Sequence, residues 1–245
     1  MNYLWNLGKT SQLFGFRGTA LKQVHFYNTN RAITVGNIFC IGRNYCDHIA
    51  ELKNKSESTP LVFLKPTSAL NTESRIHLPA FSKEIDYETE LVLLIGQAAK
   101  QIKPEEALSC IAGYAVGLDL TARDLQTQAK ERRWPWALAK GFDYAACVSQ
   151  FVPAEEIAKP HQLEFAMKLN GEIRQQGYAQ QMIFDIPYLI HYLSSMFTLQ
   201  TGDLIFTGTP GGVGRLHPGD RIEIDLADKL NATFMVSELS QASNE

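Results

Sequence analysis

The chain has 245 residues, of which 45% are hydrophobic and 20% charged, and its formal net charge is −3. This composition is typical of a folded globular protein with a sizeable core, and the small net charge argues against a nucleic-acid-binding protein. No apolar run approaches the roughly 18 residues that a membrane-spanning helix needs, so we expect neither nucleic acid nor a membrane as a partner.

The start of the chain differs from the rest in its charge. The first acidic residue is Asp47, whereas four basic residues lie before residue 36: Lys9, Arg17, Lys22 and Arg31. We interpret residues 1–35 as an N-terminal arm or extension, with an organelle transit peptide as the alternative. The four cysteines form no C-x-x-C pair, which favours reduced thiols and a cytoplasmic location. If the acid-free start is a transit peptide, the expected location becomes an organelle matrix.

Short apolar segments begin near residue 37. Residues 37–45 are predicted to form a short buried strand followed by a turn, and further strands are predicted at 60–66 and 88–96. A helix start is predicted at Pro104, where two glutamates favour the first turn. A second helix is predicted over 120–133. These elements are short and do not alternate regularly.

The second half of the chain continues the pattern. Residues 163–177 alternate around Asn170-Gly171, which predicts a β-hairpin. A mostly apolar helix is predicted over 182–197, followed by a strand that enters a glycine-rich loop at 206–214 and by two closing strands. Strands therefore dominate, which argues against a TIM barrel or a doubly wound sheet. We predict one β-rich α+β domain over residues 36–245.

Two glutamates stand at the start of the strand predicted at 88–96. Glu88 and Glu90 are two residues apart, so a strand would place them on the same face. Buried side by side they would repel each other and lose hydration, unless a cation lay between them. A surface edge strand would remove the problem, but the apolar run 91–95 favours a central strand. The pair therefore indicates a divalent-metal site.

A third carboxylate follows in the segment 117–133. Asp119, Arg123 and Gln126 stand at i, i+4 and i+7, which predicts one common helix face. The simpler alternative is an ordinary Asp119–Arg123 ion pair on a helix. Three carboxylates without histidine or cysteine suit Mg²⁺, with Mn²⁺ or Ca²⁺ as alternatives.

Other residues could handle protons or anions. His48 and Glu51 stand at i and i+3, so the carboxylate could orient the imidazole to activate water, although an isolated pair of this kind is more often a surface contact. Lys140 lies in an apolar and aromatic context and is either a buried charge or a lysine reaching the surface. Thr209 stands in the glycine-rich loop, which could cradle an anion or form a tight turn.

The order of the motifs is more specific than any one of them. The chain resembles the fumarylacetoacetate hydrolase family in CIGRNYCDHIAEL, PLVFLKP, DYETELVLLIG, IAGYAVGLDLTARDLQ, WALAKGFD, NGEIRQQG and LIFTGTPGGVG. This resemblance implies a mixed β-sandwich or roll with a few helices and a lid helix, and a homodimer with one Mg²⁺ or Mn²⁺ per site. It also implies roles for nine residues: metal ligands Glu88, Glu90 and Asp119, catalytic residues His48, Glu51 and Lys140, and substrate-binding residues Arg123, Gln126 and Thr209.

The resemblance also implies a reaction on a small 2-oxo acid. We expect a hydrolase that cleaves the C–C bond of 2,4-diketo acids, such as fumarylpyruvate, and releases pyruvate as an enolate. An oxaloacetate decarboxylase or tautomerase, or an isomerase of aromatic catabolism, is the alternative because each needs the same enolate. A metal-binding module without activity is a further alternative, although it would not need His48, Glu51 and Lys140.

Overall fold

The structure is a computed structural model that describes residues 21–47 and 58–238. Its central feature is the apolar run that begins after Glu90: β8 (Thr89–Ile95) is buried along its whole length, as is its neighbour β9 (Ile111–Asp119). Such continuous burial is typical of strands covered on both faces. The prediction of a central rather than an edge strand at 88–96 is confirmed.

These two strands lie within a large mixed sheet. Its order is β4-β3-β15-β8-β9-β11-β5, and β12 pairs with β9 beside this path. The other strands of this sheet are β3 (Ile38–Gly42), β4 (Leu61–Lys65), β5 (Leu70–Asn71), β11 (Ala146–Val148), β12 (Val152–Pro153) and β15 (Leu204–Phe206). The sheet brings segments from both halves of the chain beside β8.

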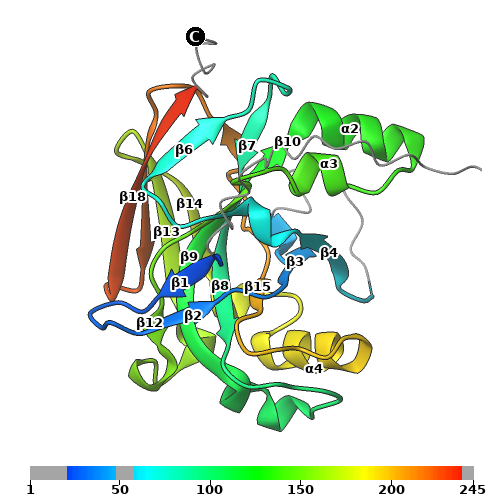
Figure 1. The fold of residues 1–245 in the computed structure, drawn as a ribbon, viewed down its shortest axis with the longest axis vertical. Coiled ribbons are helices and arrows are strands. Elements are labelled where there is room, and N and C mark those ends of the chain that lie inside the picture. Colours follow the sequence, from blue (N-terminus) through cyan, green and yellow to red (C-terminus); the bar gives the residue numbers. More distant parts are fainter. Residues whose placement is uncertain (1–20, 48–57, 239–245) are drawn as a thin grey trace, which may run out of the picture.

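A second sheet of five strands covers one face of the first. Its order is β14-β13-β17-β18-β6, and β17 packs on β9 while β13 packs on β8. These strands alternate between buried and exposed positions, as expected where one face meets the core. They are β6 (Arg75–Leu78), β13 (Glu164–Leu169), β14 (Glu172–Tyr178), β17 (Arg221–Leu226) and β18 (Leu230–Glu238). Figure 1 shows the two sheets as adjacent layers.

Two small sheets complete the strands. β7 (Ile85–Tyr87) pairs with β10 (Thr121–Ala122) on one side and β16 (Gly214–Arg215) on the other. β1 (Gln23–His25) and β2 (Ala32–Thr34) form a hairpin whose end meets Phe151. Part of the predicted N-terminal arm is thus a β-hairpin with two side chains, Val24 and Phe26, in the core. Residues 1–20 lie outside the described residues.

The helices are few and short. α2 (Arg123–Arg132) and α3 (Ala137–Lys140) pack on each other, and α4 (Ile186–Met196) lies at a different edge of the molecule (Figure 1). The 3₁₀ turns are η1 (Thr67–Ala69), η2 (Pro104–Cys110), η3 (Ala154–Glu156), η4 (Pro160–Gln162) and η5 (Ala179–Gln181). The predicted β-rich α+β class is confirmed. No described helix combines the length and apolarity that crossing a bilayer would require.

Local sequence signals account for two of these elements. Asp185 caps α4 by accepting a hydrogen bond from Tyr188 N at 2.8 Å, and Pro187 occupies the first turn. Asn170 and Gly171 both have positive φ, 54° and 87°, which suits a tight hairpin turn between β13 and β14. The predicted hairpin at 163–177 is therefore present, and the predicted helix at 182–197 forms over the shorter range Ile186–Met196.

Candidate active site

Three carboxylates from two adjoining strands meet in the core. Glu88 immediately precedes β8, Glu90 lies within it, and Asp119 ends the neighbouring β9. The Glu88 carbonyl accepts a hydrogen bond from Asp119 N at 2.8 Å, which fixes the two strand ends together. One oxygen from each of the three carboxylates lies within 4.8 Å of the other two, and the three residues are only 1–5% exposed. We call these residues the acidic triad.

The predicted helix face at Asp119 is wrong. Asp119 belongs to β9, the chain stays extended through β10, and helix α2 begins only at Arg123. The pairing of β10 with β7 consumes the residues that would have formed the first helical turn. Asp119 and Arg123 reach the site from two different elements, and Arg123 pairs with Asp86 and Glu88.

Two buried lysines hold the triad. Lys140, the last residue of α3, places Nζ 2.6 Å from Glu88 Oε2 and 2.7 Å from Asp119 Oδ2. Lys65, from β4, places Nζ 2.7 Å from Asp119 Oδ1. Burial lowers the pKa of Lys140, but the charges of Asp119 and Glu88 outweigh it and hold the pKa above its ordinary value. Lys140 is therefore an ammonium, and it is not a surface lysine.

Arg123 forms the side of the site at the start of α2. Its Nε donates to Asp86 Oδ2 at 2.7 Å, and its two terminal nitrogens donate to Glu88 Oε1 at 2.6 Å and to Gln126 Oε1 at 2.7 Å. Burial lowers the Arg123 pKa, but the charges of Glu88 and Asp86 hold it above its ordinary value. The guanidinium orientation is thereby fixed by three side chains.

The glycine-rich loop closes the site next to Glu90. Gly208 N donates to Glu90 Oε2 at 2.7 Å, and Thr209 Oγ1 accepts a hydrogen bond from Gln175 Nε2 at 2.8 Å. Burial, with the charges of Asp119 and Glu88, raises the Glu90 pKa well above its ordinary value, although the Gly208 hydrogen bond lowers it. Without a bound cation, burial therefore favours the protonated form of Glu90.

The donor set fits a hard divalent cation. Lys65, Arg123 and Lys140 pair with Asp86, Glu88 and Asp119, and the backbone N–H of Gly208 donates to Glu90. Because burial disfavours the charged form of Glu90, a bound cation would stabilise its carboxylate. Three carboxylate oxygens without sulfur or imidazole suit Mg²⁺ or Mn²⁺. Glu88, Glu90 and Asp119 would hold the ion.

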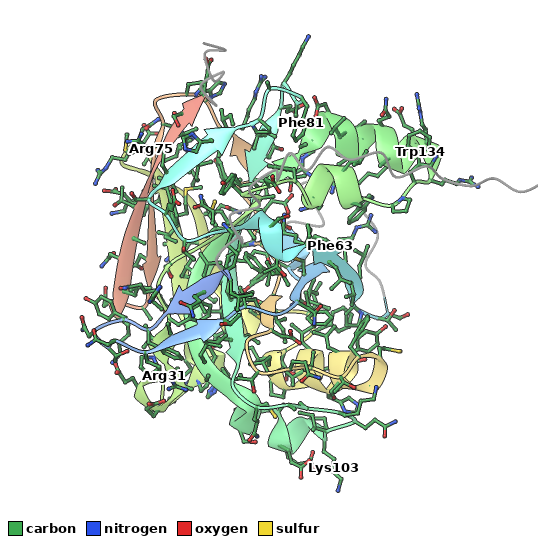
Figure 2. All side chains as sticks on the ribbon, viewed as in Figure 1. Arg31, Phe63, Arg75, Phe81, Lys103 and Trp134 are labelled. Carbon is green, nitrogen blue, oxygen red and sulfur yellow. The ribbon has the colours of Figure 1, made fainter. Side chains whose placement is uncertain are left out.

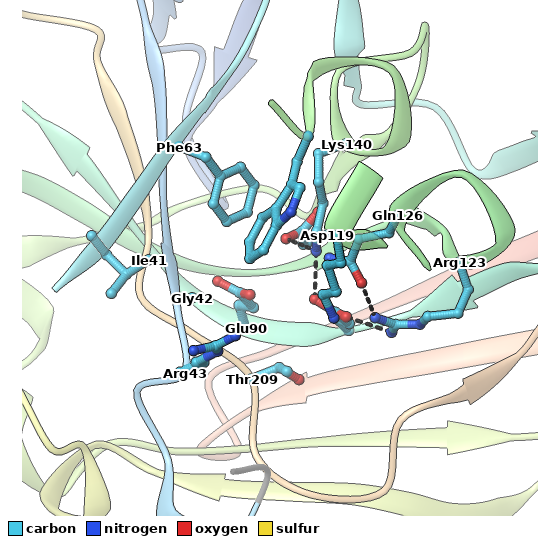
Figure 3. A pocket seen from close by; sticks show the side chains of 13 residues that line it. Ile41, Gly42, Arg43, Phe63, Glu90, Asp119, Arg123, Gln126, Lys140 and Thr209 are labelled. Atoms are coloured by element: carbon cyan, nitrogen blue, oxygen red, sulfur yellow. Dashed lines mark hydrogen bonds and ion pairs between the residues drawn. The ribbon is translucent and has the colours of Figure 1, made fainter. Parts of the chain in front are cut away.

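A narrow pocket opens onto the triad. Figure 3 shows Arg123 and Gln126 on one side of it, Arg43, Glu90 and Thr209 on another, and Phe63 beside Lys140. Phe63 and Trp136 form an aromatic wall, with ring centroids 5.8 Å apart. The cavity volume is about 30 Å³, far below the 490 Å³ of a cavity lined by residues 78–85 and 215–218. We place the site by its chemistry rather than by size, because the larger cavity lacks such a carboxylate cluster.

The structure gathers seven of the nine predicted site residues around this pocket. His48 and Glu51, with the lid helix, lie outside the described residues. Three participants were not predicted from the sequence: Lys65, Asp86 and Gln175. The one signal for Lys65 is a lysine in the apolar run PLVFLKP, and Asp86 directly precedes the Y-E-T-E stretch.

The family model for the fumarylacetoacetate (FAA) hydrolase C-terminal domain matches residues 37–237. The chain belongs to the fumarylacetoacetate hydrolase family. This match covers the triad, both lysines and the glycine-rich loop, and it confirms the resemblance inferred from the motifs. We therefore interpret the site as the active site of an enzyme of this family.

Curated relatives share much of the chain. The human protein named oxaloacetate tautomerase FAHD1, mitochondrial, is 43% identical over 203 residues, which are 82% of this chain and 92% of that protein. The Caenorhabditis elegans protein named oxaloacetate tautomerase fahd-1, mitochondrial, is 40% identical over 227 residues, which are 92% and 99% of the two chains.

A solved structure of this family is also similar. Fumarylpyruvate hydrolase from Pseudomonas aeruginosa, determined in complex with Mn²⁺ and pyruvate, matches with a TM-score of 0.87 and 32% identity. The match covers 91% of this chain and 99% of that one. The Mn²⁺ complex of that relative and the acidic triad here together make a divalent metal the expected cofactor.

Proposed function

We propose that this protein uses a bound divalent cation to convert a small 2-oxo acid through its enolate, with keto–enol tautomerisation of oxaloacetate as its reaction. The observation that carries the proposal is the position of Lys140, whose ammonium lies 2.6 and 2.7 Å from two carboxylates of the acidic triad. The names of the curated relatives support oxaloacetate as the substrate.

The residues around the pocket would have separate roles in forming the enolate. A divalent cation bound by the triad supplies Lewis-acid charge to the oxygen on which negative charge develops. Lys140 adds a second, preorganised positive charge, and it carries a proton at Nζ. Arg123, oriented by Asp86 and Gln126, would hold the carboxylate of the substrate, and Thr209 would donate a hydrogen bond from the opposite side.

The test follows the loss of enol-oxaloacetate by its ultraviolet absorbance. We expect the protein with Mg²⁺ to accelerate ketonisation, chelation to abolish the effect, and Lys140→Met to reduce the rate about a hundredfold or more. Asp119→Asn controls for catalysis by free Mg²⁺, and Lys229→Met, an exposed substitution, controls for loss of a lysine. If the wild-type protein with Mg²⁺ were no faster than Asp119→Asn, the proposal would be wrong.

Hydrolysis of a 2,4-diketo acid is the second candidate. The similarity to fumarylpyruvate hydrolase favours it, and the same enolate would leave as pyruvate. This reaction also needs an activated water, the role predicted for His48 and Glu51. We would assay fumarylpyruvate cleavage beside oxaloacetate ketonisation in wild type and His48→Ala. Selective loss of the cleavage would support hydrolysis, whereas equal rates of cleavage in both proteins would contradict it.

Location and assembly complete the proposal. The two animal relatives are named as mitochondrial, and the chain has no acidic residue before Asp47, so we propose an organelle matrix in preference to the cytoplasm. A fluorescent protein fused to residues 1–35 would stay in the cytosol if this is wrong. The homodimer remains a prediction, which sedimentation equilibrium would test.

A further inference from the structure

The ammonium of Lys140 lies against an aromatic ring as well as against the acidic triad. Its Nζ stands over the ring of Phe63, 5.1 Å from the ring centre, and Figure 3 shows the two side chains next to each other at the pocket. This distance is within the range, up to about 6 Å, in which the negative face of an aromatic ring attracts a cation. Lys140 is 2% exposed, so water screens the attraction little.

The ring and the carboxylates hold this ammonium in different ways. An ammonium has three N–H groups, and Lys140 Nζ donates to Glu88 Oε2 at 2.6 Å and to Asp119 Oδ2 at 2.7 Å. Residues 21–47 and 58–238 supply no third hydrogen-bond acceptor to Nζ. The ring face attracts the positive charge but accepts a hydrogen bond much more weakly than an oxygen does. Phe63 can therefore hold the ammonium in place and leave its third N–H to an oxygen of the substrate.

Neighbouring residues fix the ring and the lysine relative to each other. Trp136 meets the Phe63 ring edge to face, at 5.8 Å between centroids and 66° between planes. The Trp136 carbonyl also accepts hydrogen bonds from Ala139 N and Lys140 N, each at 2.9 Å. From β4, Lys65 stands two residues after Phe63 on the same face of the strand and donates to the Lys140 carbonyl. The ring is thus built into the same support as Lys140.

We propose that Phe63 is a positioning residue for the reaction, whose aromatic face holds the Lys140 ammonium with its third N–H directed into the pocket. The inference rests on the proposed function, because the charge of Lys140 accelerates the reaction only if negative charge develops beside it. Without the ring, the two carboxylates alone attract the ammonium, and its third N–H can turn away from the pocket. Fewer molecules then present the N–H where the enolate oxygen forms.

The alternative is that Phe63 only fills space in the aromatic wall. Fluorination separates the two roles, since each fluorine weakens the negative face of the ring and changes its size little. Mono-, di- and trifluorinated phenylalanine would be placed at position 63 by stop-codon suppression, and ketonisation of enol-oxaloacetate measured in Mg²⁺. We expect kcat to fall with each added fluorine, by about three- to thirtyfold at the trifluorinated ring, the factor one buried cation–π contact can supply. KM should stay unchanged, because the ammonium acts on charge that develops in the transition state.

Phe81 is the matched control. Its ring also meets another aromatic ring edge to face, that of Phe142 at 5.6 Å and 76°, and it lies apart from Phe63 (Figure 2). Among the described residues, no lysine or arginine stands over the Phe81 ring. The same fluorinated series at position 81 should therefore leave kcat unchanged.

Nuclear magnetic resonance tests the contact without activity. The ring current of Phe63 should displace the ε-methylene proton signals of Lys140, which Lys140→Met identifies by their loss, and Phe63→Leu should remove the displacement whereas Phe81→Leu should not. Undisplaced signals in wild type, or a kcat that is constant through the series at position 63, would overturn the role of Phe63 alone. Equal falls in kcat at positions 63 and 81 would also overturn it. A wild-type rate no faster than that of Lys140→Met would overturn the proposed function and this inference with it.

Discussion

Lys65 Nζ lies 2.7 Å from Asp119 Oδ1, and the two side chains are 0% and 1% exposed. The same ammonium donates to the backbone carbonyls of Leu120 and Lys140. Lys65 therefore connects Asp119, at the end of β9, with Lys140, at the end of α3. Because all of these groups are buried, the arrangement is stable only when every member is present.

Lys65→Met should therefore cost about 3–5 kcal/mol of the free energy of unfolding, since it leaves a buried carboxylate with one cation fewer and two carbonyls without a donor. Urea denaturation of the metal-free protein measures this loss. Lys229→Met, in an exposed turn, is the matched control and should change stability by less than about 0.5 kcal/mol. Similar small changes in both variants would show that Asp119 is held without Lys65.

Glu90 should make the metal-free protein less stable as the pH rises. Its folded-state pKa is raised well above 4.5, so the folded protein keeps a proton that the unfolded chain releases. The free energy of unfolding should then fall as the pH rises from about 4.5 to the raised folded-state pKa of Glu90. Glu90→Gln lacks this ionisation, so its stability advantage over wild type should grow through that window.

Urea denaturation in a chelator at several pH values would follow this difference, and parallel pH profiles for wild type and Glu90→Gln would refute it. Calorimetry gives an independent readout. Because a cation replaces the Glu90 proton, Mg²⁺ affinity of the wild-type protein should rise with pH through the same window.

Local patterns were sufficient for part of this site. The two-residue spacing of Glu88 and Glu90 before an apolar run predicted a buried carboxylate pair, because strand alternation depends on neighbouring residues alone. The Asn170-Gly171 hairpin and helix α4 are equally local, since turn conformation and helix periodicity are written in consecutive residues.

These local patterns could not predict which distant segments pair with one another. Asp119 was assigned to a helix, and it reaches the triad because β9 pairs with β8 in a register that sets Glu90 opposite Gly117. Lys65 contacts Asp119 because the larger sheet contains both β4 and β9. Gln175 reaches Thr209 because the five-stranded sheet packs on the larger one. No local spacing encodes these neighbours, and the carboxylates alone did not reveal how many cations surround them.

Gly208→Ala should destabilise the loop that donates to Glu90. Gly208 has φ of 105°, and a Cβ there would lie 2.6 Å from Asn44 Cβ. Asn44 cannot move away easily, because Phe184 N also donates to its Oδ1 at 2.7 Å. Gly219→Ala is the matched control, since Gly219 has φ of 92° but open space at the Cβ position.

Both substitutions carry the left-handed backbone cost of about 1 kcal/mol, so their difference in denaturation free energy isolates the clash. We expect Gly208→Ala to lose about 1–3 kcal/mol more than Gly219→Ala and to weaken Mg²⁺ binding as well. Equal losses in the two variants would mean that the loop shifts without strain at Asn44.

Gln175→Leu should uncouple the five-stranded sheet from the site. Gln175 is 1% exposed; its Oε1 accepts a hydrogen bond from Thr89 N at 2.8 Å, and its Nε2 donates to Thr209 Oγ1 at 2.8 Å and Pro210 O at 3.0 Å. Leucine fills similar space but leaves these groups unpaired, at about 1–3 kcal/mol for each buried group. Denaturation and faster hydrogen exchange at the Thr89 amide would report the loss. Gln176→Leu, at the exposed neighbouring position, should leave both unchanged, and a protected Thr89 amide in Gln175→Leu would contradict this role.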